Sequence, residues 1–121
     1  RSADVRDLLA ARDGGDARAA LALEIYETVA AKHVAALVTV LGGLDTLVFT
    51  AGIGEHAAPV RAGIAARLAH LGVTVEGRAN DANAPVISPP DAPVTVRVEP
   101  TNEEMMMARH AARLGAITPG P

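Results

Sequence analysis

The sequence predicts an α/β domain in which a mainly parallel sheet is covered by helices. Two apolar segments rich in β-branched residues, 44–50 and 94–98, have the length and composition of strands. A glycine turn and a helical pattern follow the first of them directly, and further turns and loops separate it from the second. Because parallel strands need a long crossover connection, usually a helix, this alternation favours parallel pairing.

The N-terminal third of the chain is predicted to be helical. Ser2 can cap a short helix through Arg12, which a pair of glycines ends. A longer helix starts at Asp16, and the apolar stripe that we expect to face inward recurs at four-residue spacing: Leu21, Ile25 and Val29. The opposite face is polar: Glu24, Glu27, Thr28 and Lys32. Residues 34–41 almost lack a polar face, which predicts burial on several sides, either in a domain core or in an interface, and the glycines at 42–43 stop the helix.

The remaining elements follow from local residue chemistry. Pro59 is tolerated in the first turn of a helix, Gly72 is suited to a helix end, and Thr101 with Glu103 forms a capping box. In chain order we expect a strand at 44–50, a helix at 56–70, a strand at 73–75, a polar loop at 77–85, strands at 86–88 and 94–98, a helix at 101–114, and a disordered tail at 117–121.

Composition limits the classes of function. The 121 residues include no cysteine, which excludes a disulfide framework, a zinc site built on thiolates and a cysteine nucleophile. The net charge is −3 and Lys32 is the only lysine, so we expect no nucleic acid partner. The longest nearly uncharged run, 34–44, is too short to cross a bilayer, which predicts a soluble protein with no membrane partner.

The core predicted from this composition is thin for an independent domain. Alanine dominates the apolar residues, and Tyr26 and Phe49 are the only aromatic ones. Small domains already bury the smallest fraction of their surface. Since the chain also starts at Arg1 inside a helical pattern, we expect it to be a fragment whose missing part completes the fold.

The most informative motif is Gly52-Ile53-Gly54, between a predicted buried strand and a helix. Glycines there let backbone N–H groups and a helix N-terminus approach an anion or a nucleotide sugar, although a tight turn with no ligand remains an alternative. The spacing also fits the dinucleotide pattern G-x-G-x-x-A, with Glu76 near the position of a ribose-binding acid. On the motif alone, a Rossmann-type oxidoreductase stays open.

The order of several segments along the chain resembles the C-terminal part of the acetate kinase family, over nearly all of the chain up to Leu114. The segments that carry the resemblance are SADVRDL (2–8), GGLD (42–45), VFTAGIGE (48–55), VR (60–61), LGV (71–73) and PTNEE (100–104). FTAGIGE and PTNEE are specific to acetate and short-chain acyl kinases. The resemblance implies an RNase H-like fold of the acetate and sugar kinase/heat-shock cognate/actin superfamily, with residues 1–116 forming the C-terminal portion of the nucleotide-binding domain.

The resemblance also implies an activity. Family members transfer the γ-phosphoryl group of ATP to acetate with Mg²⁺, giving acetyl phosphate and ADP, and are typically cytoplasmic homodimers. The positions that match the nucleotide-binding segments are Asp4, Val5, Arg6, Gly52, Ile53, Gly54 and Glu55. His56 stands where the family usually has Asn, and Glu103 matches the magnesium-linked glutamate.

The family's active-site arginines, catalytic aspartate and phosphate-contacting histidines have no counterpart in these residues, so we expect no activity from the chain alone. The acyl substrate, whether acetate, propionate or butyrate, stays open. Two other functions remain as alternatives: a non-catalytic dimerisation module that uses residues 34–41, and the Rossmann-type domain.

Overall fold

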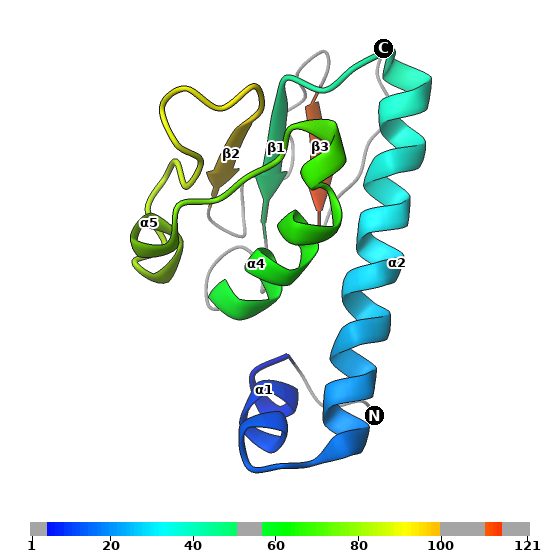
Figure 1. Cartoon of the computed structure of the whole chain (residues 1–121), viewed down its shortest axis with the longest axis vertical. Helices are drawn as coiled ribbons and strands as arrows, with labels where there is room; N and C mark the ends of the chain where they lie inside the picture. Colours follow the sequence, from blue (N-terminus) through cyan, green and yellow to red (C-terminus); the bar gives the residue numbers. More distant parts are fainter. Residues whose placement is uncertain (1–4, 51–56, 100–110, 115–121) are drawn as a thin grey trace.

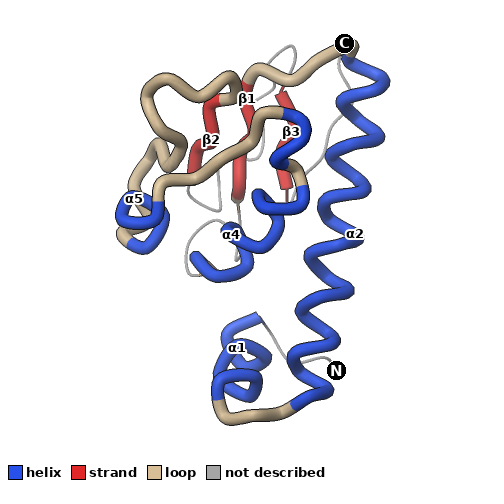
Figure 2. Tube along the Cα trace, viewed as in Figure 1, coloured by secondary structure: helices blue, strands red, loops and turns tan. Residues whose placement is uncertain are grey.

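The computed structural model describes residues 5–50, 57–99 and 111–114, the last of these as backbone only. Figures 1 and 2 show a small sheet with α4 in front of it and the long helix α2 beside it. The elements are α1 (Val5–Asp13), α2 (Ala17–Leu41), β1 (Thr46–Phe49), α4 (Ala58–Arg67), the 3-10 helix η1 (Ala69–Leu71), α5 (Gly77–Asp81), β2 (Thr95–Val98) and β3 (Ala111–Leu114).

The described strands form one parallel sheet in the order β2-β1-β3. Leu47 of the central strand is in register with Val96 on one side and with Ala112 on the other. The prediction of an α/β fold with a mainly parallel sheet is therefore confirmed.

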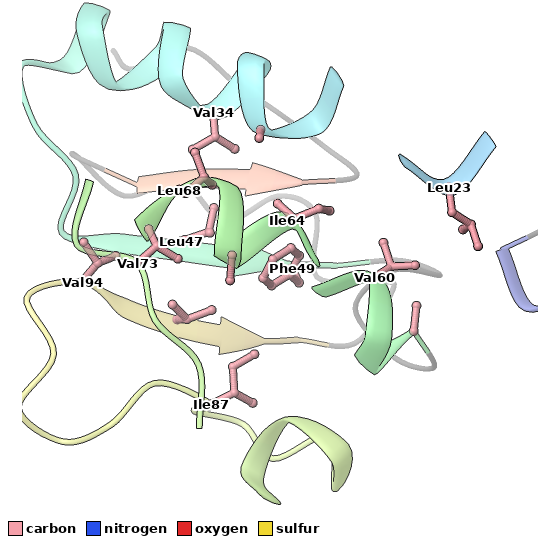
Figure 3. Packing of buried hydrophobic residues seen from close by; sticks show 14 residues of the cluster. Leu23, Val34, Leu47, Phe49, Val60, Ile64, Leu68, Val73, Ile87 and Val94 are labelled. Carbon is pink, nitrogen blue, oxygen red and sulfur yellow. The ribbon is translucent and has the colours of Figure 1, made fainter. Parts of the chain in front are cut away.

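The core lies between this sheet and α4. Leu47 and Phe49 alternate along β1 and are fully buried, together with Ile64 of α4 and Leu68, the residue that directly follows α4 (Figure 3). Val34 of α2 belongs to the same cluster. Each fully buried side chain of this size contributes roughly 1.5–3 kcal/mol to folding. The aliphatic composition thus suffices for a compact layer of helix on sheet.

Helix α2 presents to the core a different face from the one predicted. Leu21, Ile25 and Val29 are 56%, 55% and 53% exposed, so the prediction that this stripe faces inward is wrong. The buried side chains of α2 come from another face: Ala19, Leu23, Glu27, Ala31 and Val34. Most side chains of this face are small, so α1 and α4 approach α2 closely. Glu27, on the same face, forms an ion pair with Arg67.

The second half of α2 is also less buried than expected. Val40 is 76% exposed, and among the described residues only Val34 of the segment 34–41 is buried. The expected ends of the helix are confirmed. The Asp16 carboxylate accepts hydrogen bonds from the N–H groups of Arg18 and Ala19, and Gly42 ends the helix at φ +84°.

Four local predictions differ from the structure, and those that concern strands are decided by long-range pairing. Residues 73–75 form no strand, and the predicted loop 77–85 contains α5. The segment 86–88 pairs with β2 only through one antiparallel bridge, Val86 with Arg97. Residues 111–114 form β3, not the end of a helix, because they complete the second edge of β1. The rest of that predicted helix, residues 101–110, and the tail 117–121 lie outside the described residues.

Candidate functional site

At the carboxyl edge of the sheet, the two strands that precede the segments 51–56 and 100–104 end side by side. Phe49 and Val98 are partners at the ends of β1 and β2, and the N–H of Glu99 donates to the Phe49 carbonyl oxygen at 3.0 Å. In the sequence, residues 51–56 follow Thr50 directly after β1, and residues 100–104 follow Glu99 directly after β2. Open α/β sheets bind ligands outside the carboxyl ends of their strands, so this edge is the candidate site.

Helix α1 lies at the same end of the molecule. In Figure 1 the three strand arrows point towards the end where α1 is drawn. Val5 and Arg6 begin this helix; Val5 is half-buried against the core and Arg6 is exposed. The other predicted site residues lie outside the described part of the chain: Asp4, Gly52, Ile53, Gly54, Glu55, His56 and Glu103.

Both ends of the glycine segment are anchored in the protein. Thr50, before it, and Ala57, after it, are buried. Helix α4 starts at once, with Pro59 in its first turn as predicted, and the N–H groups of Val60 and Arg61 both bond the Ala57 carbonyl oxygen. Ala57 offers no side-chain cap, so the partial positive charge of this helix N-terminus is not neutralised by its own cap residue. This arrangement fits an anionic group such as a nucleotide phosphate.

A buried arginine, whose role the sequence did not reveal, ties the first turn of α4 to α5. Arg61 is fully buried; its Nε donates to Asn80 Oδ1 at 2.7 Å, and its Nη2 donates to the Asn80 carbonyl oxygen at 2.7 Å and to Asn83 Oδ1 at 2.5 Å. Asn80 Nδ2 in turn donates to the Ala58 carbonyl oxygen at 2.9 Å. Burial lowers the pKa of Arg61, and Asp81 opposes that shift. The one available signal was a charged residue between Val60 and Ile64 on an apolar helix face.

An ion pair between the buried Glu27 and the exposed Arg67 joins the other end of α4 to α2. Glu27 Oε1 lies 3.4 Å from Arg67 Nη2, and its carboxylate occupies the space beside Gly63. Burial raises the pKa of Glu27, the positive charges of Arg67 and Arg12 lower it, and Glu24 raises it further. An open groove of about 360 Å³ adjoins this pair. It is lined by Glu24, Ile25, Thr28, Val29, Lys32 and Arg67.

The described residues give no separate support for a dinucleotide site or for a metal cluster. The Glu76 carboxylate caps α5 by accepting from the Ala79 N–H at 2.8 Å, and no strand precedes it, so it does not occupy the ribose-binding position of a Rossmann fold. No group of three His, Cys, Asp or Glu side chains able to hold a metal occurs in residues 5–50 and 57–99. The expectation of magnesium therefore depends on Glu103 alone.

Comparison with known proteins agrees with this geometry. Residues 1–109 match the family model of the Acetokinase family. The chain is 46% identical over 114 residues to an acetate kinase from Acholeplasma laidlawii, an alignment that covers 93% of the chain but 29% of the relative. Among solved structures, a propionate kinase from Francisella tularensis is 37% identical, with a TM-score of 0.76, and an acetate kinase from Porphyromonas gingivalis is 35% identical, with a TM-score of 0.75. These matches cover 88% and 83% of the chain, and 28% and 26% of those structures.

The neighbours have the RNase H-like fold that the sequence resemblance implied. Within the described residues, no helix has both the length and the apolar character needed to cross a membrane. The match over most of the chain and the similar structures lead to one conclusion: the chain belongs to the acetokinase family.

Proposed function

We propose that the chain forms the adenosine side of the nucleotide-binding domain of an ATP-dependent acetate kinase, with residues 1–116 as the closing portion of that domain. The observation that carries the proposal is the shared edge of β1 and β2, from which the segments FTAGIGE and PTNEE both leave. The reaction is transfer of the ATP γ-phosphoryl group to acetate, which yields acetyl phosphate and ADP.

In this proposal the segment around the glycines holds the nucleotide. Gly52, Ile53, Gly54, Glu55 and His56 contact adenosine, through backbone N–H groups that glycines leave accessible. Histidine can donate or accept one hydrogen bond, so His56 retains a polar contact where the family usually has asparagine. The uncapped start of α4 adds positive potential at the same place.

Two further segments complete the nucleotide site. Asp4, Val5 and Arg6 form its other wall, and the exposed guanidinium of Arg6 can stack on adenine or reach a ribose or phosphate oxygen. Glu103 is the protein contact of Mg²⁺, directly or through water, since this ion commonly takes one or two protein carboxylates beside substrate phosphates and water. When bound, Mg²⁺ neutralises charge on the transferring phosphoryl group.

The chain spans 29% of the length of the Acholeplasma laidlawii acetate kinase. The activity of the whole protein is therefore part of this proposal. The groups that hold the carboxylate and the transferring phosphoryl belong to an N-terminal part of the same protein, so the isolated chain binds nucleotide without turnover. The acceptor is acetate or another short-chain carboxylate. We propose a cytoplasmic homodimer as the working form.

Titration of the 121-residue chain with ATP·Mg and with NAD tests the nucleotide assignment. We expect saturable ATP·Mg binding, with amide chemical-shift changes at Gly52 and Gly54. Saturable NAD binding at these glycines without ATP binding contradicts the kinase assignment. As a test of function, the aligned segment of the Acholeplasma laidlawii acetate kinase can be replaced by this chain, and we expect the hybrid to form acetyl phosphate from ATP and acetate.

A non-catalytic dimerisation module is the second candidate, because α2 exposes an apolar stripe. Leu21, Ile25 and Val29 are each more than half exposed, and Val40 is exposed further along the helix. An exposed apolar strip of this kind is typical of an interface. A tight dimer in sedimentation, together with an inactive hybrid and no nucleotide binding, favours this module over the kinase.

A further inference from the structure

We propose that Asn80 of α5 is a positioning residue for the nucleotide site, because it holds the first turn of α4. The inference rests on the proposed function, since the first turn of α4 immediately follows the proposed adenosine segment. Asn80 lies 22 residues away from Ala58 in sequence, outside every segment that carries the family resemblance.

Asn80 makes three hydrogen bonds to α4, and each uses a different group. Its Oδ1 accepts from Arg61 Nε at 2.7 Å, its carbonyl oxygen accepts from Arg61 Nη2 at 2.7 Å, and its Nδ2 donates to the Ala58 carbonyl oxygen at 2.9 Å. Asn80 is buried and Arg61 is fully buried. Hydrogen bonds shielded from water fix geometry strongly, because the alternative is an unsatisfied buried group.

The chemistry of this position calls for an amide. The side chain must accept a hydrogen bond from a guanidinium and at the same time donate one to a backbone carbonyl oxygen. Asparagine does both, whereas an ionised aspartate of the same shape only accepts. The contact to Ala58 is therefore the part of the arrangement that aspartate cannot reproduce.

Helix α5 is itself held in place, so it can act as a support. Glu76 caps it at the Ala79 N–H, and Asn83, at φ +53°, directs its Oδ1 to Arg61 Nη2. The turn of α4 held in this way contains the N–H groups of Val60 and Arg61, which bond the Ala57 carbonyl oxygen. Displacement of Ala58 therefore moves the residues that directly follow the proposed nucleotide segment.

The other end of α4 provides a matched control. The pair of Glu27 and Arg67 also joins α4 to a neighbouring helix through a buried polar group, but it contacts the second half of the helix. If the role of Asn80 is only to stabilise the fold, disturbing either end should affect the nucleotide site alike. If Asn80 positions the site, only the substitution of Asn80 should affect the nucleotide site.

The test compares Asn80→Asp with Glu27→Gln in the 121-residue chain. Aspartate keeps an acceptor for Arg61 and adds an attractive charge, so we expect N80D to fold while losing the donor to Ala58. We expect the Kd for ATP·Mg to rise by about tenfold in N80D, the order of one lost hydrogen bond, and to stay unchanged in E27Q. In the hybrid kinase, N80D should raise the KM for ATP and leave the KM for acetate unchanged.

A measurement without nucleotide separates this inference from the proposed function. Amide hydrogen exchange at Val60 and Arg61 should accelerate about tenfold in N80D, because the loss of one hydrogen bond lowers the free energy that protects these amides. In E27Q the exchange rates of these two amides should not change. Failure of the wild-type chain to bind ATP overturns the proposed function and, with it, the site that Asn80 would position. Unchanged exchange in N80D, or equal acceleration in E27Q, overturns the positioning role alone. If N80D does not fold, Asn80→Ala takes its place, because it removes both side-chain contacts to α4 without adding a charge; unchanged exchange at Val60 and Arg61 in N80A overturns the role as well.

Discussion

Replacement of Gly63 by alanine should destabilise the chain, although glycine is a poor helix former. Gly63 lies inside α4, and a Cβ at this position would overlap the carboxylate of Glu27. On an open helix surface the change should stabilise by about 1 kcal/mol, because alanine has the higher helix propensity. Overpacking a filled site costs about 1–3 kcal/mol. The expected net loss for G63A is therefore between about 0 and 2 kcal/mol.

The cause of this loss can be isolated by removing the side chain that fills the site. In a Glu27→Ala background the space beside Gly63 is open, and G63A should then gain about 1 kcal/mol. Urea unfolding of the wild type, both single variants and the double variant gives the coupling energy, which we expect to be about 1–3 kcal/mol. A coupling below about 0.5 kcal/mol, within the range of independent sites, would refute the close approach of Glu27 to Gly63.

Two other predictions concern pH and backbone conformation. Burial raises the pKa of Glu27 above its ordinary value of 4.5, so the folded chain keeps a proton that the unfolded chain has released. The stability linked to that proton is present below this ordinary value and is lost as the pH rises through the raised pKa. Urea unfolding at a series of pH values should therefore show the free energy of unfolding of E27Q increasing relative to that of the wild type as the pH rises. Parallel curves of stability against pH for the two proteins contradict this prediction. Gly72 has φ +91° and its Cβ would lie 3.2 Å from Pro93 Cβ, whereas Gly42, at φ +84°, faces open space. Thermal unfolding should therefore show that G72A loses more stability than G42A, in which only the left-handed backbone costs roughly 1–2 kcal/mol. G77A serves as a near-neutral control. An equal loss of stability in G72A and G42A contradicts the contact between Gly72 and Pro93.

Features that depend on neighbouring residues in the sequence were predicted well. The apolar run 44–50 contains β1, and 94–98 contains β2. The left-handed glycine at 42 and the cap at Asp16 also follow from local chemistry, because only the residue and its own turn are involved. The strand predicted before the glycine segment and the helix predicted after it are confirmed for the same reason, since β1 ends at Phe49 and α4 begins at Ala58.

Features that depend on distant partners were missed. Hydrophobic periodicity selected the Leu21 stripe of α2, but the inward face is set by close approach to Gly63 and by the charge of Arg67, both in another helix. Strand β3 exists because β1 has a second edge to pair, which no local pattern in 111–114 reveals. Likewise, the role of Asn80 could not be predicted, since its partners on α4 lie 19 and 22 residues away.

The geometry of the candidate site depends on the same register that fills the core. The two motif segments begin side by side because Phe49 is the partner of Val98, and that register also places Val96 beside Leu47 in the buried layer. A slip of one residue would move the start of the segment after β2 along the sheet edge and would turn Val96 out of the core, because side chains alternate between the two faces of a strand. Burial of Val96 thus penalises any register that separates the proposed nucleotide and magnesium segments, so the packing that stabilises the sheet also preserves the spacing that the chemistry requires.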